Sequence, residues 1–188
     1  MFPSAEGRPD PYWSPEESEA DRLGRMTAVV RHVDAAKRDK LLLLIAKSSN
    51  DNFVSYEYVE TPSGFALNPY WLISSGAGKL DNITSLNMAE SLLYGVAVSV
   101  KPSGECIVNF NVEQIRGRSV ELIMDSEGRP ALLGYVDGKM CRLQYAYAQM
   151  RKGLIPDVEY LHLYGKGVAD GAWHKERITN TATRNAWV

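Results

Sequence analysis

The stretch "LLLLIAKSSNDNFVSYEYVE", residues 41–60, decides the fold of this chain. Its first residues, 41–46, form a short continuous apolar run, which is typical of a strand buried on both faces. From residue 53 the side chains alternate with a period of two, and this predicts a second strand with Tyr56 and Tyr58 on one face and Ser55 and Glu57 on the other. The two strands therefore predict a hairpin.

Three polar residues, Asn50, Asp51 and Asn52, stand between these two strands. Short amide and acid side chains bond the backbone two residues further on, and Asn and Asp tolerate a left-handed φ, so we expect the corner of a hairpin here. A polar ligand site built from the same residues is the alternative.

The period of two continues through most of the chain. Pro102–Gly104 and the segment "SEGR", residues 126–129, separate strand-like runs, and Asp137-Gly138 is the strongest short hairpin signal because both central residues of that turn need a positive φ. "NPYWLISS", residues 68–75, predicts a strand that Pro69 enters. These patterns predict a mainly β fold: an antiparallel β-sandwich or barrel of about eight or nine strands, with an N-terminal helix and one inserted helix.

Two helices interrupt the strand pattern. Ser14, Pro15 and Glu17 fit a capping box, and apolar residues then recur at helical steps at Leu23, Met26, Val29 or Val30, and Val33. Later, "NITSLNMAESLLYG", residues 82–95, carries a helical stripe that ends where Gly95 suits a left-handed cap; the stripe consists of Leu86, Ala89, and Leu92 or Leu93.

The chain divides into four parts on this basis. We expect an extended N-terminal arm over residues 1–15, which contain four prolines, and an amphipathic helix over 16–39. A β-rich domain follows over residues 40–178, and a C-terminal tail over 179–188. A length of 188 residues allows one domain with a sizeable core.

Composition excludes several classes of protein. The formal net charge of -2 gives no general attraction to nucleic acid, and no basic cluster stands out. No apolar run is long enough to cross a bilayer, and no secretory signal is visible. Cys106 and Cys141 lie in strand-like runs, which favours two reduced, buried thiols and an intracellular location, with cytoplasmic or cytoskeletal and mitochondrial sites left open.

No motif in the sequence predicts catalysis, a metal or a cofactor. His32, His162 and His174 have no second ligand at metal-site spacing. The segment "SSGAGKL", residues 74–80, lacks the residues of a phosphate-binding loop, and no nucleophile stands on a sharp turn. Two carboxylate pairs are expected to be solvated surface charges: Glu57 with Glu60, and Glu121 with Asp125.

Aromatic residues are the most distinctive feature of the predicted strands. They fit either a half-buried pleated surface or the lining of a cavity in a barrel, and they lie at alternating positions: Tyr56, Tyr58, Tyr70, Trp71, Tyr145, Tyr147, Tyr160 and Tyr164.

The order of four segments resembles a known family. "IAKSSNDNFVSYEY", "LNPYWLI", "LLYGV" and "VEYLHLYGKG" together are similar to the domain-of-unknown-function family numbered 4833, over residues 41 to about 178. Many relatives resemble exported bacterial proteins, and the family implies no activity. The resemblance places a shared pattern at Asn50, Asn52, Tyr56, Asn68, Pro69, Trp71, Tyr94 and Gly95.

Three functions follow as hypotheses. The first is a non-catalytic accessory subunit of a larger protein assembly, which docks through aromatic residues in its extensions: Phe2, Tyr12, Trp13, Trp173 and Trp187. The second is a module that binds a small molecule in a tyrosine-lined cavity. The third is an enzyme that uses Asn50, Asp51, Tyr56 and His162, although no tuned acid–base pair is evident. We favour the first.

Overall fold

The computed structural model describes residues 18–62, 64–74, 80–151 and 157–179. It contains three helices, α1 (Glu19–His32), α2 (Ala35–Arg38) and α3 (Met88–Tyr94). The strands are β1 (Leu41–Lys47), β2 (Asn50–Thr61), β3 (Gly64–Ser74), β4 (Leu80–Ser85), β5 (Val96–Val100), β6 (Cys106–Phe110), β7 (Val120–Met124), β8 (Pro130–Val136), β9 (Lys139–Arg151), β10 (Asp157–Gly167) and β11 (Trp173–Thr179).

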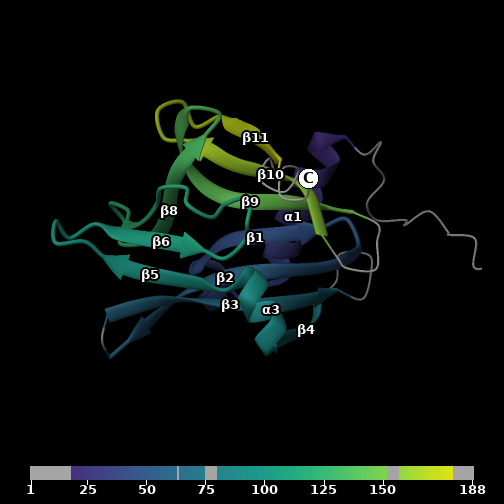
Figure 1. Cartoon of the computed structure of the whole chain (residues 1–188), viewed down its shortest axis with the longest axis horizontal. Coiled ribbons are helices and arrows are strands. Elements are labelled where there is room, and N and C mark those ends of the chain that lie inside the picture. Colours follow the sequence, from purple (N-terminus) through teal and green to yellow (C-terminus); the bar gives the residue numbers. More distant parts are fainter. Residues whose placement is uncertain (1–17, 63, 75–79, 152–156, 180–188) are drawn as a thin grey trace, which may run out of the picture.

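All the described strands belong to one sheet that curls into an open half-barrel (Figure 1). The strand order is β4-β3-β2-β1-β9-β8-β7-β6-β5, and β10 pairs with both β9 and β11. The mainly β, antiparallel prediction is confirmed. The finer prediction differs: there are eleven strands in one curled sheet, whereas about eight or nine in a sandwich or barrel were expected.

Strand β9 is the centre of the sheet because it pairs with three strands. Along one edge, residues 139–143 pair antiparallel with β8, and residues 145–148 pair parallel with β1. Along the other edge it pairs with β10 over almost its whole length. The parallel β1–β9 pair was not predicted, since its two strands lie about a hundred residues apart and no local pattern marks them as neighbours.

The buried strand and two of the predicted turns are found where expected. Residues 42–46 of β1 are all buried. Asp137 and Gly138 both have a positive φ, of 50° and 74°, as the hairpin between β8 and β9 requires. The hairpin between β5 and β6 turns at residues 102–104, where the Gly104 N–H donates to the Lys101 carbonyl at 2.8 Å.

Pro69 does not begin a strand, contrary to the sequence prediction. It lies in the middle of β3, opposite Tyr56 of β2. The pairing of β3 with β4 on its other edge begins only at Tyr70, which faces Ser85. Pro69 therefore lies where β3 has lost that neighbour, and a missing N–H is tolerated at such an edge.

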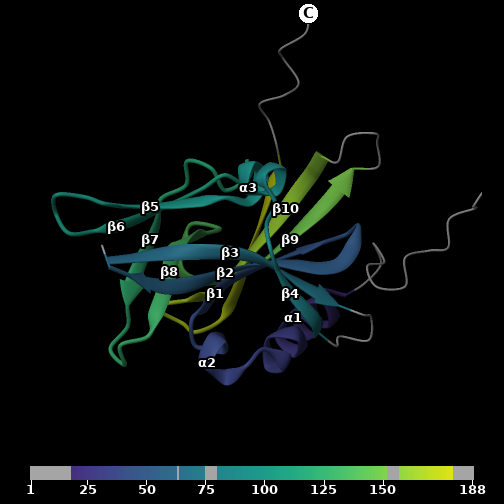
Figure 2. The ribbon, with the colours of Figure 1, turned by 90° about the horizontal axis from the view of Figure 1, so that it is seen from below.

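Helix α1 covers the outer face of the sheet, and α3 lies on the opposite face (Figure 2). The side chain of Ser18 accepts a hydrogen bond from the Asp21 N–H at 3.2 Å and caps α1. The predicted cap residues, Ser14, Pro15 and Glu17, lie outside the described residues. The predicted single helix over 16–39 is divided in two, because Val33 is extended, with φ −74° and ψ 140°.

Two hydrophobic clusters fill the two faces of the sheet. The outer cluster joins the predicted stripe of α1 to the sheet, and its members from α1 and the adjoining Val33 are Met26, Val29 and Val33, with Leu23 and Val30 packed against them. The inner cluster is larger and fills the half-barrel with side chains of β1–β3 and β6–β10 together with Tyr94 of α3, and the partly buried Val96 and Val98 of β5 pack against it.

The cysteines and the membrane prediction can also be compared with the structure. Cys141 is buried and Cys106 is half-buried, and no disulfide joins them. Burial raises the pKa of the Cys141 thiol. Of the helices in the described ranges, none has the length and apolar character needed to cross a membrane.

Replacing Met26 by Ala tests the docking of α1. Met26 is fully buried, so its truncation leaves a cavity between α1 and the sheet and should lower the free energy of unfolding by about 2–5 kcal/mol. Arg31→Ala, on the exposed side of the same helix, is the matched control and should change it by no more than about 0.5 kcal/mol. Chemical denaturation measures both values, and equal effects would show that α1 does not pack as described.

Candidate functional site

Helix α3 begins with a complete capping box. The Asn87 side-chain oxygen accepts from the Glu90 N–H at 2.9 Å, and the Glu90 carboxylate accepts from the Asn87 N–H at 2.8 Å. The two bonds satisfy donors that a helix leaves without an intrahelical partner. Asn87 is therefore the residue that caps this helix.

Gly95 ends α3, but not in the left-handed conformation that the sequence suggested. Its φ is −60° and its ψ is 162°, an extended conformation open to any residue. Glycine is needed for a different reason, the close approach of neighbouring atoms. An added Cβ would lie 2.2 Å from the Ser91 carbonyl oxygen and 2.7 Å from the Asn111 side-chain nitrogen.

The C-terminal end of α3 is fixed to the interior of the half-barrel. Tyr94 is buried, and its ring meets the Trp71 ring edge to face at 5.7 Å. The Tyr56 hydroxyl donates to the Tyr94 carbonyl at 2.9 Å, and the Tyr56 ring packs edge to face against Phe110 at 5.1 Å. Burial raises the pKa of Tyr56, so its hydroxyl stays protonated and able to donate this bond.

Lys47 and Glu90 place two opposite charges beside these rings. The Lys47 Nζ lies 4.1 Å from the centre of the Trp71 ring and 5.9 Å from that of Tyr94, which is cation–π geometry. Burial lowers the pKa of Lys47, and the Glu90 carboxylate opposes this shift. The pKa of Glu90 is lowered by the Asn87 N–H, by a hydrogen bond from Trp71 and by Lys47.

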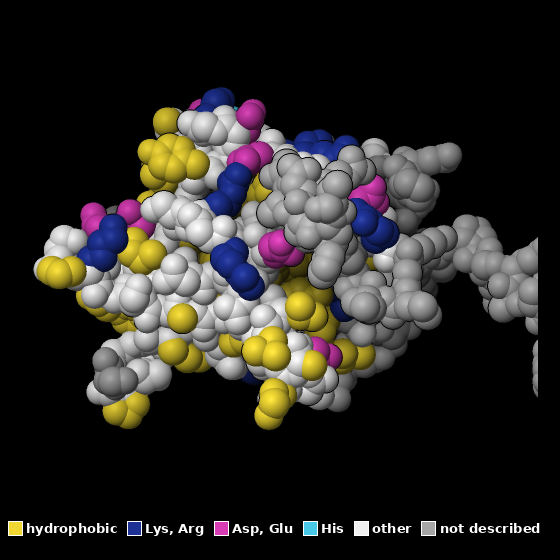
Figure 3. Space-filling view, in the orientation of Figure 1, with side chains coloured by type: hydrophobic (Ala, Val, Ile, Leu, Met, Phe, Trp, Pro, Cys, Tyr) yellow, Lys and Arg dark blue, Asp and Glu magenta, His cyan; other side chains and the backbone are white. Residues whose placement is uncertain are grey.

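The outward side of α3 is apolar and carries part of the stripe that the sequence predicts. Met88, Leu92 and Leu93 are exposed by 85%, 71% and 60%, and only Tyr94 of the helix is buried. Ala89 is exposed as well, whereas Leu86 packs partly against the core. A group of hydrophobic side chains is visible over α3, below the centre of Figure 3. We call Met88, Leu92 and Leu93 the α3 face.

A hollow of about 170 Å³ adjoins the α3 face. Its polar rim comes from the segment after β6, in which the Arg116 guanidinium donates to the Asn111 carbonyl at 2.9 Å and the Gln114 amide donates to the Val158 carbonyl at 3.3 Å. The lining residues are Leu92, Leu93, Tyr94, Asn111, Val112, Glu113, Gln114, Arg116, Met150 and Val158.

The hairpin turns at residues 48 and 49, before the predicted corner, and Asn50 and Asn52 belong to the start of β2. The Asn52 N–H donates to the Asn50 side-chain oxygen at 3.1 Å, two residues away, and the Ser74 N–H donates to the Asn52 side-chain oxygen at 3.3 Å. The amides thus tie β2 to itself and to β3. The side chain of Asp51 lies outside the described residues, and a ligand role for this corner stays a prediction.

The structure unites some predicted site residues and separates others. Tyr56 and Trp71 both contact Tyr94 at the base of α3, whereas Asn68 is exposed, opposite Glu57 in the sheet. Trp173 stacks on Tyr145 of its own domain at 5.6 Å. Phe2, Tyr12, Trp13 and Trp187 lie outside the described residues.

The tyrosines do not line one common cavity. Tyr56 and Tyr58 belong to the inner cluster, and the outer cluster under α1 holds Tyr70, Tyr145, Tyr147 and Tyr164. Alternation along the strands divides them between the two faces, as expected for a half-buried pleated surface.

One prediction about a charged residue also has an outcome. Glu57, expected on the surface, is 9% exposed. Within the described part of the chain, no three His, Cys, Asp or Glu side chains are grouped so that they could hold a metal ion.

These features define a curled, mainly antiparallel sheet with a packed interior and one short helix that displays an apolar face. The chain belongs to the family described as "Domain of unknown function (DUF4833)", which matches residues 43–177. The predicted resemblance is confirmed over nearly the range expected. Neither the curated proteins nor the solved structures include a match to this chain.

Gly95→Ala tests whether close packing fixes the end of α3. The added methyl group would collide with backbone, so we expect a loss of about 1–3 kcal/mol in the free energy of unfolding. Gly24→Ala is the control: nothing lies within 4 Å of its added Cβ in α1, and Ala there should stabilise by about 0.5–1 kcal/mol. Similar changes in both variants, measured by urea denaturation, would contradict the account of Gly95.

Glu90→Gln tests the charge on the α3 cap through pH. Because the folded pKa of Glu90 is lowered, its stabilising contribution is complete above the unfolded value of about 4.3 and is lost as pH falls through the folded pKa. Glutamine still accepts the Asn87 bond but carries no charge. The difference in unfolding free energy between wild type and variant should therefore shrink below about pH 4. A difference that stays constant between pH 7 and pH 3 would contradict this.

Proposed function

We propose that the chain is a non-catalytic accessory subunit of a larger protein assembly and that it binds a partner protein through the α3 face. The observation that carries the proposal is the combination of a firmly anchored helix and three large apolar side chains that it exposes to solvent. Apolar groups gathered on a surface and rimmed by polar residues are typical of interaction sites.

The charges around the α3 face favour a protein as the partner. The rim of the adjoining hollow carries one acid, Glu113, and one base, Arg116, and the chain has a formal net charge of -2. Such a rim suits the mixed polar groups of a polypeptide, whereas nucleic acid and anionic lipid need a positive surface. A hollow of about 170 Å³ suits one apolar anchor side chain from that partner.

The anchoring of α3 lowers the cost of such docking. Its C-terminal end is held by Tyr56, Tyr94 and Asn111, so little conformational entropy remains to be lost when a partner binds. The proposed docking through Phe2, Tyr12, Trp13 and Trp187 would add to the α3 face and remains part of the proposal. An intracellular site is likewise proposed.

A second candidate function is the binding of a small apolar molecule at the other end of the half-barrel. A hollow of about 360 Å³ opens there, in the size range of small-molecule sites. The rings of Tyr58 and Phe65 stack at 5.9 Å on one wall, and Cys106 and Met124 lie on another. A molecule carried in it would be detected by mass spectrometry of the denatured, freshly purified chain.

Charged substitutions on the α3 face test the first function. The tagged full-length chain is purified gently from its own cells, and near-stoichiometric partners are measured by mass spectrometry. We expect Leu92→Asp with Leu93→Asp to abolish their recovery, because carboxylates oppose apolar burial. Val168→Asp, at an exposed valine away from α3, is the control and should retain them.

Equal recovery with all three chains would contradict the role of the α3 face. Deleting residues 1–15 separates the contribution of the arm: weakened recovery with an intact fold is expected if the arm also docks. Intact recovery would remove the arm from the proposal and leave the α3 face.

A further inference from the structure

A third hollow lies where β9 changes partner, on the side of the sheet that faces α1. Strand β8 pairs with β9 as far as Leu143, and β1 takes over from Tyr145. Strands β1 and β8 run in opposite directions along this edge and separate at Gln144. The separation leaves a hollow of about 330 Å³, bounded on the helical side by Val30, Arg38 and Asp39.

The lining of this hollow combines apolar and cationic groups. Five leucines of β1, β8 and β9 lie along its wall: Leu41, Leu42, Leu44, Leu132 and Leu143. Val30 of α1 and Leu41 are half-buried, whereas the other four leucines are buried. Its charged residues are three arginines, Arg38, Arg129 and Arg142, against one acid, Asp39. We call this hollow the arginine pocket.

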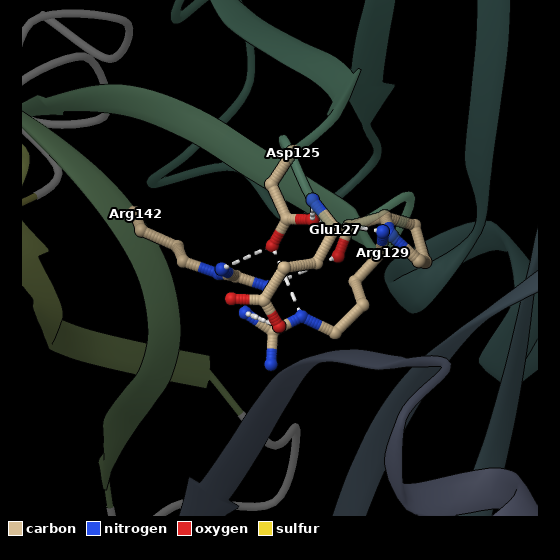
Figure 4. A network of polar contacts seen from close by, with 5 residues as sticks. Asp125, Glu127, Arg129 and Arg142 are labelled. Carbon is tan, nitrogen blue, oxygen red and sulfur yellow. Dashed lines mark hydrogen bonds and ion pairs between the residues drawn. The ribbon is translucent and has the colours of Figure 1, made fainter.

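Two of the arginines are positioned by Asp125, which lies between them in Figure 4. The Asp125 carboxylate accepts from the Arg129 Nε at 3.1 Å and from Arg142 at 3.2 Å. It also accepts the backbone N–H groups of Glu127 and Arg129, at 3.0 and 2.8 Å. These bonds, with that of the Arg129 N–H first, lower the pKa of Asp125 to about 2, so it stays charged at neutral pH.

The network corrects the prediction that Asp125 is a solvated surface charge. Its side chain is only 18% exposed, and the tight turn after β7 and the register of β8 with β9 bring Arg142 to it. The sequence gives no sign of this, because Arg142 is separated from Asp125 by 17 residues.

The third arginine is fixed independently. Arg38 donates from one guanidinium nitrogen to the carbonyls of Arg31, at 3.1 Å, and of Val33, at 3.0 Å, near the C-terminal end of α1. A guanidinium has five N–H donors, so each of the three arginines retains donors beyond those used in these contacts.

We propose that the arginine pocket binds a small organic anion, a carboxylate or phosphate ester with a short apolar body. Guanidinium groups match both anions with paired hydrogen bonds, and held side chains lose little freedom on binding. Val30 and Leu41, the half-buried apolar residues of the lining, would contact the apolar body. The volume lies at the lower end of the range for small-molecule sites. The site is separate from the α3 face, so a test of anion binding does not depend on the proposed function.

Binding of three short amphiphiles to the purified full-length chain tests the proposal. Isothermal titration uses octanoate, octyl phosphate and octyltrimethylammonium, each below its micelle concentration. We expect one octanoate or octyl phosphate to bind saturably per chain, and the cation, which has the same alkyl chain as octyl phosphate, not to bind. The stronger of the two anions identifies the head group as carboxylate or phosphate.

Variants locate the binding. Arg142→Gln and Arg38→Gln should each weaken anion binding at least about tenfold, as expected for the loss of charge-assisted hydrogen bonds. Arg177→Gln, on β11 over the ring of Tyr160, is the matched control and should leave it unchanged. Arg38 makes no contact with Asp125, so Arg38→Gln remains informative if Arg142→Gln lowers the melting temperature. Absence of saturable anion binding, or equal binding by wild type and Arg38→Gln, would overturn the proposal.

Discussion

The rest of the structure depends on how the backbone of β9 is hydrogen-bonded. Each strand has two edges, and β9 gives one to β10 and divides the other between β8 and β1. Buried N–H and C=O groups must be paired, so this division fixes where β1 and β8 lie and joins the two halves of the sheet. Because β1 and β8 share one edge of β9 and run in opposite directions, they separate at Gln144. The sheet curls into the half-barrel that α1 covers from outside and α3 from inside.

Both candidate sites follow from this arrangement. The arginine pocket is the space left where β8 and β1 separate, with Arg142 reaching into it from β9 itself. The α3 face arises at the opposite side of the sheet, where Tyr56 and Trp71 need a cover and Tyr94 supplies it. A helix held mainly by its last residue has most of its surface left over, and in α3 that surface carries leucines and a methionine. Hydrophobic residues that the fold does not use for its own core suit the core of a protein interface.

Local patterns predicted the parts of the fold that are local. The apolar run at residues 41–46, the alternation in β2 and the Asp137-Gly138 turn each depend only on neighbouring residues. The segments that resemble the family predicted its range almost completely, since the family matches residues 43–177. The predictions failed where the structure depends on which elements lie next to each other. The stripe of α3 has helical spacing, but spacing cannot tell whether a face is covered by the protein or left to solvent. Likewise Asp125 and Arg142 meet only through the register of β8 with β9.

The central claim is that α3 is held rigidly against the half-barrel and exposes its apolar face to solvent. Amide hydrogen exchange of the full-length chain tests this directly, because protection reports the free energy of local opening. The decisive amides are those of Gly95, which donates to Ser91, and Asn111, which donates to Gly95, both at 2.8 Å. We expect their protection to approach that of residues 145–148 in β9. Rapid exchange at Gly95 and Asn111 beside a protected β9 would show that α3 opens on its own, and its exposed leucines would then not form a fixed docking surface.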